Sequence, residues 1–262
     1  MRVERPIRCS HGLWLALALL SCPLATPTVA QEVAVDIGHT LAAHGATSAR
    51  GRGEFYFNRD LAQALVVALQ AQGVRTRLIN GDGRIGSLQA RPAEAAGADL
   101  LISIHHDSVN EWELQSWEWQ GETRDYNDDF AGYSLFVSRD NPDTARSILC
   151  ARTMSARLAH MGFVGTDKNG RRRPFVDREL KVHYFDGLAV LRHATMPAVL
   201  FEAGVIKNRN EELLLQDPAR IARMADGLAT GIVACLRAGR PGESEAVADR
   251  PDEVALPPQT NQ

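Results

Sequence analysis

Apolar and polar residues follow two different periods along this chain, and segments with one period alternate with segments that have the other. Apolar runs or strict alternation over about four to eight residues are typical of strands, whereas apolar positions three or four residues apart are typical of helices. Strand character is found in six stretches: 33–37, 74–79, 99–104, 133–138, 188–192 and 197–204. Helix character is found in four others: 54–73, 88–97, 142–161 and 218–238.

The alternation of strands and helices determines the expected fold class. Strands joined through helices pair in parallel, because the crossover returns the chain to the same end of the sheet. Continuous apolar strands are typical of a sheet that is buried on both faces. The sequence therefore predicts an α/β fold in a single domain, with a mostly parallel twisted sheet and helices on both faces.

The first thirty residues have the pattern of a secretory signal peptide. Three arginines precede the apolar run 13–20, and small residues lead to a cleavage site after Ala30. The apolar run is too short to span a membrane. We therefore expect a signal peptide at 1–30 and a periplasmic or secreted mature chain. The alternative is a lipoprotein, in which Cys22 of the stretch LLSC carries the lipid.

Length and charge narrow the classes of protein further. Residues 31–239 suit one domain of ordinary size, and the acidic, proline-rich stretch 240–262 has too few large apolar residues to fold, so a disordered tail is expected. Removal of residues 1–30, which carry a net charge of +2, changes the formal charge from −3 to −5. A chain with this charge is not built to bind nucleic acid.

Two cysteines remain after residues 1–30 are removed. Cys150 and Cys235 both lie in apolar helical segments. An oxidising compartment favours a disulfide between them. Two separate buried thiols agree equally well with the sequence.

Proton-binding side chains follow three of the predicted strands. His39 follows the strand 33–37, His105 follows 99–104, and Glu202 interrupts 197–204. In parallel α/β sheets, ligands bind where the carboxyl ends of the strands meet. Glu54 opens the first long helix, and the loop rich in glycine and alanine before it lets its carboxylate approach His39. Two histidines and a carboxylate are a ligand set for catalytic zinc, and Glu202 is then the base that takes a proton from the bound water.

Each of these residues also has a simpler explanation when it is taken alone. A histidine after a strand is commonly a hydrogen-bonded structural group, Glu54 suits the positive end of a helix, and Glu202 suits an ion pair with an arginine. The coincidence at one edge of the sheet favours the metal site. His106 points to the opposite face from His105 on a continuing strand, so only one of the two can reach the metal.

The segments that carry these residues resemble a known family. VAVDIGHT, the helix that begins at Glu54, DLLISIHHDS and MPAVLFEAGVIKNRNEELLL are similar to the successive motifs of the zinc-dependent N-acetylmuramoyl-L-alanine amidases of bacterial cell walls, the Amidase_3 type. The resemblance covers Val33 to Leu236. It implies zinc bound by His39, Glu54 and His105, with Glu202 as general base.

The resemblance also implies a substrate and a catalytic domain at 31–239. The substrate is peptidoglycan, cleaved at the amide between N-acetylmuramic acid and L-alanine of the stem peptide. The chain departs from the usual motifs after each functional residue, at Thr40, at His106-Asp107 and at Ala203-Gly204-Val205. These departures concern substrate preference and leave the ligands and the base in place.

Two segments have no clear place in the predicted fold. Residues 110–132 carry three tryptophans among many acids, which fits a flap that stacks on sugar rings or a surface excursion packed on the domain. Residues 165–180 are basic, and Arg171, Arg172 and Arg173 suit either carboxylates of a stem peptide or a solvated loop. Three further histidines suit structural roles, with the last the most suggestive of a site: His44, His183 and His193.

Two alternatives to the amidase hypothesis stay open. One is a zinc amidohydrolase or peptidase that acts on another N-acyl amino acid or peptide. The other is a non-catalytic wall-binding regulator on the same scaffold, which the presence of all three ligands and the base disfavours. No wall-binding repeat is visible, so targeting to glycan strands and stem peptides falls to the catalytic domain or to a protein activator.

Overall fold

The computed structural model describes residues 31–238. The predicted signal peptide at 1–30, with its alternative lipidated Cys22, and the predicted tail at 240–262 lie outside these residues. Within residues 31–238, none of the helices combines the length and the apolar character needed to cross a bilayer.

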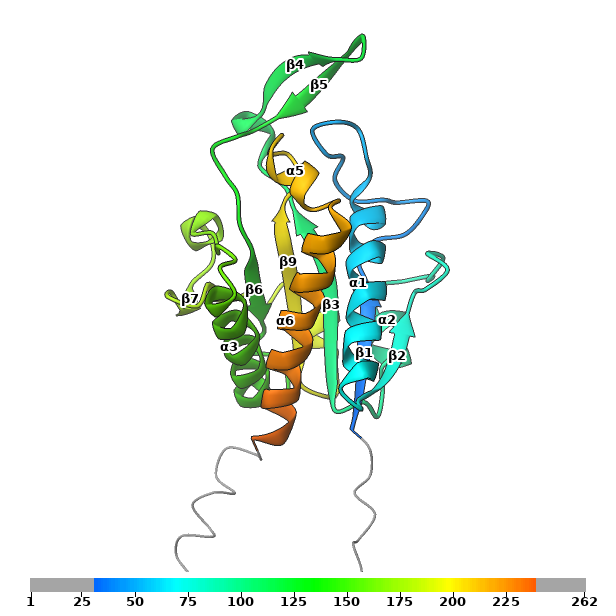
Figure 1. The fold of residues 1–262 in the computed structure, drawn as a ribbon. Helices are drawn as coiled ribbons and strands as arrows, with labels where there is room; N and C mark the ends of the chain where they lie inside the picture. The colour runs from blue at the N-terminus through cyan, green and yellow to red at the C-terminus, as the bar shows by residue number, and fades with distance from the viewer. Residues whose placement is uncertain (1–30, 239–262) are drawn as a thin grey trace, which may run out of the picture.

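The described residues form a seven-stranded sheet in the order β2-β1-β3-β9-β6-β8-β7 (Figure 1). Four of its pairings are parallel, and β6 with β9 and β7 with β8 are antiparallel. The sheet is therefore mostly parallel, as predicted. Its strands are β1 (Glu32–Ile37), β2 (Arg75–Ile79), β3 (Leu100–Asp107), β6 (Ser134–Val137), β7 (Phe175–Asp177), β8 (Val182–Tyr184) and β9 (Ala198–Val205).

Helices cover both faces of the sheet, but unequally. Three long helices lie side by side over one face in Figure 1: α1 (Glu54–Ala71), α3 (Thr144–His160) and α6 (Pro218–Arg237). Together with alternate residues of β1, β3 and β9 they form the larger apolar core. The short helices α2 (Ala90–Glu94) and α4 (Ala189–Arg192) contribute to a smaller core on the other face. The predicted α/β class with helices on both faces is confirmed.

The prediction of a strand at 188–192 is wrong, because these residues form α4. Its buried residues Val190 and Leu191 pack against Leu200 and Met196 in the smaller core. A short apolar run reads the same way for a buried strand and for one turn of buried helix, so period alone did not separate them.

The two segments without a predicted place form additions to the sheet. Residues 110–132 contain a short 3₁₀ helix (Glu111–Glu113) and a hairpin of β4 (Gln115–Trp119) and β5 (Glu122–Tyr126), which stands beyond the carboxyl ends of β3 and β9 (Figure 1). Residues 165–180 contain a second 3₁₀ helix (Lys168–Arg171) and the edge strand β7. The remaining short helix, α5 (Glu211–Leu214), follows β9.

Cys150 of α3 and Cys235 of α6 form a disulfide, with 5.0 Å between their Cα atoms. Both residues are buried in the larger core. The structure thus selects the disulfide from the two arrangements that the sequence left open.

Candidate active site

His39, Glu54 and His105 form a cluster whose ligand atoms all lie within 4.8 Å of one another. Oε2 of Glu54 lies 3.0 Å from Nε2 of His39, and Oε1 lies 3.0 Å from Nδ1 of His105. The two imidazole rings meet edge to face, with 4.9 Å between their centroids. The three residues that the sequence predicted as ligands are therefore brought together.

Each member of the cluster comes from a different element at the carboxyl edge of the sheet. His105 lies on β3, His39 follows β1, and Glu54 is the first residue of α1. Two glycines make this approach sterically feasible. A Cβ on Gly38 would lie 2.3 Å from Nε2 of His105, and one on Gly45 would lie 2.5 Å from Oε2 of Glu54.

The electrostatics of Glu54 favour its charged form. Burial raises the pKa of this carboxyl, but hydrogen bonds with His105 and His39 outweigh burial and hold the pKa well below its usual range. A buried, ionised carboxylate between two imidazoles matches the nitrogen and oxygen donors that Zn²⁺ takes at catalytic sites with three protein ligands. The residues present therefore fit this metal.

Glu202 lies beside His105 in the sheet. The two residues are register partners in the parallel ladder of β3 and β9, so their side chains emerge on the same face. The ladder then shifts register between His105 and Asp107, which is a β-bulge of the kind found next to active sites.

The carboxyl of Glu202 differs from that of Glu54 in having no partner. Its Oε2 atom is buried, and no group within residues 31–238 forms a hydrogen bond with it, so the predicted alternative of an ion pair with an arginine is not found there. Burial raises the pKa of Glu202, and the nearby carboxylates of Asp107 and Glu54 raise it further. This carboxyl therefore binds a proton more readily than an exposed glutamate does.

Asp107, the last residue of β3, supplies a third carboxylate, and nearby side chains of the protein pair with it. Nζ of Lys168 lies 2.9 Å from its Oδ1, and Nδ2 of Asn169 donates to its Oδ2 over 2.8 Å. Asn169 also donates to Oγ of Ser134, which faces Glu202 across the antiparallel pair of β6 and β9. The 3₁₀ helix of residues 168–171 is thus fixed to the edge of the site.

His106 lies on the opposite face from His105, as the alternation of strand side chains predicts. It is buried among core residues, and its Nδ1 lies 2.8 Å from Oδ1 of Asn58. Burial lowers the pKa of His106 to about 3, so the ring is neutral. Nδ2 of Asn58 in turn donates to Oε1 of Glu54 over 3.2 Å, which makes His106 a support beneath the cluster.

The backbone of His39 is held by residues that the sequence did not single out. His39 has a left-handed φ of 66°, which is uncommon outside glycine. Its carbonyl accepts hydrogen bonds from Nδ2 of Asn80 over 2.7 Å and from Nη2 of Arg91 over 2.6 Å. Arg91 is itself buried in an ion pair of 2.6 Å with Asp36. An aspartate inside the apolar strand 33–37 was the one available signal, since a buried carboxylate needs a partner.

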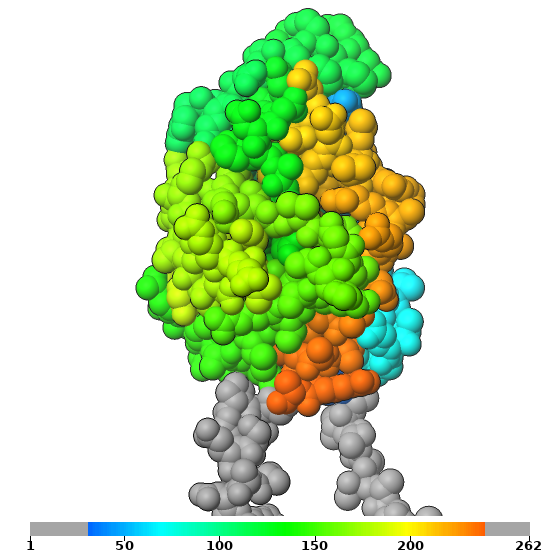
Figure 2. All heavy atoms as spheres, turned by 60° about the vertical axis from the view of Figure 1, so that its left-hand side comes forward, coloured from blue at the N-terminus to red at the C-terminus, as the bar shows by residue number. Residues whose placement is uncertain are grey.

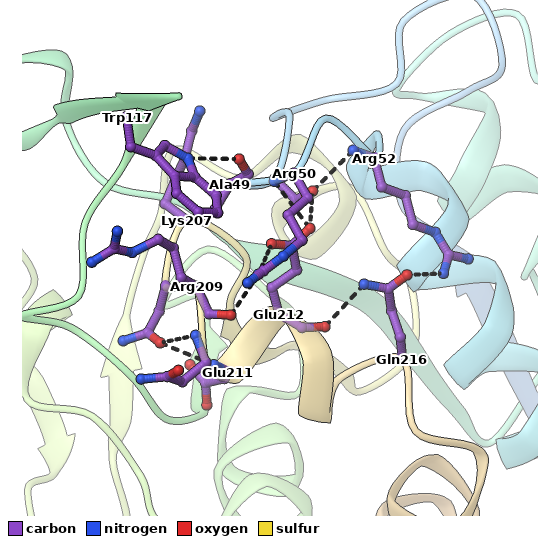
Figure 3. Close-up of polar contacts among 12 residues, drawn as sticks. Ala49, Arg50, Arg52, Trp117, Lys207, Arg209, Glu211, Glu212 and Gln216 are labelled. Carbon is purple, nitrogen blue, oxygen red and sulfur yellow. Dashed lines mark hydrogen bonds and ion pairs between the residues drawn. The ribbon is translucent and has the colours of Figure 1, made fainter. Parts of the chain in front are cut away.

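The loop between His39 and Glu54 is anchored to α5, as Figure 3 shows. Oγ of Ser48 donates to Oε1 of Glu212 over 2.6 Å, and Nη1 of Arg50 lies 3.0 Å from Oε2 of the same buried carboxylate. These contacts fix the loop that brings two cluster residues together.

The hairpin is tied to the same loop (Figure 3). Nε1 of Trp117 donates to the carbonyl of Ala49 over 3.2 Å. The guanidinium of Arg50 lies over the rings of Trp117 and Trp119. Of the two explanations that the sequence left open, these contacts favour packing on the domain for Trp117 and Trp119. Trp112 is different, because 73 % of its surface is exposed.

Among the described residues, the three other histidines that the sequence singled out are not part of the group that could hold a metal. His44 is exposed and contacts Thr47, and His183 is buried between the rings of Phe136 and Phe175. His193 follows α4 and precedes β9, so it lies at the amino end of the strand whose carboxyl half carries Glu202. The suggestion that His193 marks a site is not supported.

Comparison with known proteins places the chain in a family. The model of the family described as N-acetylmuramoyl-L-alanine amidase matches residues 33–234. No curated protein matches the sequence.

Solved structures of amidases share the fold. The catalytic domain of CwlV, an N-acetylmuramoyl-L-alanine amidase from Bacillus (Paenibacillus) polymyxa var. colistinus, is 25 % identical, with a TM-score of 0.61, and the match covers 79 % of this chain and 98 % of that one. Ami1 from Mycobacterium smegmatis is 23 % identical, with a TM-score of 0.62 over 79 % of this chain and 96 % of that one. An N-acetylmuramoyl-L-alanine amidase from Clostridium difficile 630 is 21 % identical, with a TM-score of 0.62, and the match covers 80 % of this chain and 98 % of that one. This chain belongs to the N-acetylmuramoyl-L-alanine amidase family of enzymes.

Proposed function

We propose that the protein is an exported zinc hydrolase that cleaves the amide bond between N-acetylmuramic acid and L-alanine in peptidoglycan. Membership of the family supports the reaction. The observation that carries the zinc mechanism is the cluster of His39, Glu54 and His105 next to an unpartnered buried carboxyl. The geometry suits hydrolysis, because it joins a metal-binding set to a group that binds a proton.

The three residues of the cluster would hold the metal. Zinc, when bound, supplies Lewis acidity that activates water and polarises the amide carbonyl. Glu54 contributes the negative charge of the ligand set and the histidines contribute neutral nitrogens. The hydrogen bonds from Asn58 and from the backbone N–H of Ala46 fix the orientation of the Glu54 carboxylate.

Glu202 moves the proton. Its Oε2 takes a proton from the attacking water as the new C–O bond forms at the amide carbon. It then gives this proton to the nitrogen as the C–N bond breaks, so that the products are a free lactyl carboxylate and a free amine of L-alanine. The raised pKa of Glu202 suits both transfers, because a carboxyl with a higher proton affinity than usual accepts a proton more readily from water before it passes that proton on.

The export of the protein is a further part of the proposal. It rests on the arginines, apolar run and small-residue site of residues 1–30, with 31–239 as the catalytic domain and 240–262 as a tail. N-terminal sequencing of the protein recovered from the periplasm or medium tests this proposal. A chain that begins at Gln31 supports cleavage, a lipidated Cys22 supports the lipoprotein alternative, and an intact Met1 contradicts both.

The experiment that tests the function combines metal content with peptide release. Mature wild-type protein and the variant Glu202→Gln are incubated with purified peptidoglycan, and free stem peptides are measured by mass spectrometry. Zinc content is measured on the same samples. The exposed Glu179→Gln variant is the control, because it makes the same chemical change on the surface.

Three outcomes distinguish the alternatives. One zinc per chain, with release that is lost in Glu202→Gln but kept in Glu179→Gln, supports the proposal. Zinc without release from peptidoglycan, but with hydrolysis of other N-acyl amino acids or peptides, favours the broader amidohydrolase. Wild-type protein that holds no zinc and cleaves nothing favours a binding regulator. A requirement for a protein activator would appear as release only when cell extract is added.

A further inference from the structure

A cavity of about 240 Å³ opens beside Glu202 and continues the candidate site. One wall comes from the end of β3 and the residues after it, and the opposite wall comes from the basic segment 165–180. Figure 2 shows this segment, in yellow-green, on the surface below the hairpin. The residues of the cavity that carry charge are Asp107, Lys168, Arg171, Arg172, Arg173 and Glu202.

The cations of the cavity differ in their partners. Lys168 is paired with Asp107, and Arg171 is paired with Glu113 over 2.7 Å. Among residues 31–238, no carboxylate forms an ion pair with Arg172 or Arg173. Two guanidinium charges therefore line the cavity without an acidic partner from the protein.

Aromatic rings and backbone contacts hold both arginines in place. The guanidinium of Arg172 lies 4.8 Å from the centre of the Trp112 ring, and that of Arg173 lies 3.6 Å from the centre of the Phe185 ring. Their backbone N–H groups both donate to the carbonyl of Asn169, over 3.1 and 2.9 Å. Nη1 of Arg173 also donates to the carbonyl of Arg172 over 3.3 Å. A guanidinium has five N–H donors, so both arginines keep donors for a contact with a carboxylate.

In the proposed substrate, carboxylates lie on only one side of the amide bond that is cleaved. The lactyl carboxyl of N-acetylmuramic acid is consumed in the amide, so the glycan side is uncharged N-acetyl sugar. Every carboxylate of the substrate then lies on the peptide side of the bond. Two unpaired arginines next to Glu202 match the peptide side and have nothing to bind on the glycan side.

We propose that Arg172 and Arg173 form a subsite that binds a carboxylate of the stem peptide, and so determine specificity for acidic peptides over amidated ones. This proposal rests on the amidase function proposed above. It also gives the exposed Trp112 a role, as the platform for Arg172 rather than as a surface for a sugar ring. The arginines position the peptide and take no part in proton transfer.

The test compares two soluble substrates. One is N-acetylmuramoyl-L-alanyl-D-glutamate with free carboxylates, and the other is the same compound with its carboxyls converted into carboxamides. The wild-type protein is compared with the double variant Arg172→Gln/Arg173→Gln. Arg178→Gln is the matched control, because Arg178 is exposed, belongs to the same segment and does not line this cavity.

The expected result is a change in preference. The wild type hydrolyses the acidic substrate with a kcat/KM roughly ten- to a hundredfold higher than that of the amidated one, as expected for hydrogen bonds to a charged group. The double variant loses this preference through a higher KM for the acidic substrate, so its kcat/KM falls more on the acidic substrate than on the amidated one. Arg178→Gln keeps the preference.

Three results would overturn the subsite: no preference in the wild type, an equal loss on both substrates in the double variant, or loss of the preference in Arg178→Gln. Failure of the amidase function would look different, because the wild type would then cleave neither substrate. In that case the subsite is decided by binding of free L-alanyl-D-glutamate in titration calorimetry. Weaker binding by the double variant than by Arg178→Gln supports it, and equal binding by all three proteins refutes it.

Discussion

Gly45 is the position where one added carbon most directly tests how the candidate metal cluster is built. A Cβ there would lie 2.5 Å from Oε2 of Glu54 and 2.7 Å from Nε2 of His39. These are the atoms that meet in the cluster. Gly73, at the end of α1, is the matched control, because its φ of +79° is close to the +76° of Gly45 and a Cβ on it would have nothing within 4 Å.

The two Gly→Ala changes introduce the same backbone strain, but only one of them also introduces a steric clash. An alanine in the left-handed region costs about 1–2 kcal/mol at either position. Only at Gly45 must neighbouring atoms also retreat by about 1 Å, since ordinary contacts with carbon lie at about 3.5–4.0 Å. A displacement of that size at reacting groups costs on the order of a hundredfold in rate. We therefore expect Gly45→Ala to lose both zinc affinity and activity.

Three measurements separate these effects. Urea unfolding of the chelated proteins reports the backbone strain, and both variants should lose stability. Competition with a chromogenic chelator reports zinc affinity, and peptide release reports kcat/KM; only Gly45→Ala should fall in these two assays. Wild-type zinc affinity in Gly45→Ala, or an equal loss in Gly73→Ala, would refute the view that Gly45 is required by the cluster.

Three further predictions follow from buried groups. Arg91→Met leaves the Asp36 carboxylate buried without a cation and should lower the free energy of unfolding by about 3–5 kcal/mol in urea. Glu202→Gln should make the metal-free protein more stable than the wild type at pH 8. Burial raises the pKa of the native Glu202 carboxyl above its unfolded value, so the wild type loses stability as pH rises through the native pKa. The stability gain of the variant should vanish below about pH 4.3, where the carboxyl is protonated in both states. Replacing both Cys150 and Cys235 by Ala opens a loop with a sequence separation of 85, which on the chain-entropy model costs about 4.5 kcal/mol.

Each of the three has a control of its own. Arg77→Met removes an arginine whose ion pair with Glu32 is partly exposed, and it should cost far less than Arg91→Met. Glu179→Gln should have the same pH dependence of stability as the wild type. If Glu179→Gln altered this pH dependence as much as Glu202→Gln does, the effect could not be assigned to Glu202. Reductant should destabilise the wild type but not the double cysteine variant, and identical responses would argue against the disulfide.

The fold was predictable where segments were long or strongly patterned. The helices α1, α3 and α6 and the strands of the sheet centre follow directly from period and from residues such as Gly73 and Pro142. The segment 188–192 was not predictable, because a run of four apolar residues before Arg192 fits a strand or a helical turn equally well. The hairpin was also beyond prediction, since its tryptophans are held by Arg50 and Arg209 from distant parts of the chain.

In the candidate site, too, some residues were predictable from the sequence and others were not. The sequence could place His39, His105 and Glu202 at one edge of the sheet, because the carboxyl ends of parallel strands meet there and this rule needs no knowledge of contacts. Arg91 was not found: Asp36 inside an apolar strand indicates that a partner is needed, but that partner lies 55 residues away and the sequence does not identify it. Supporting residues of this kind are defined by tertiary contact alone, which a single sequence does not contain.

Three carboxylates meet at the edge of this sheet, and their neighbours give them different properties. Glu54 touches two imidazoles, which keep it ionised and suited to hold a cation. Lys168 compensates the charge of Asp107, and Asn169 donates a hydrogen bond to it, so both residues fix the basic segment to β3. Only Glu202 has a buried oxygen without a partner, and the two other carboxylates raise its proton affinity. The proposed base therefore depends on the ion pairs of its neighbours. Removal of Lys168 should leave Asp107 uncompensated and raise the pKa of Glu202 further. If Glu202 is the base, the pH profile of peptide release would then move to higher pH.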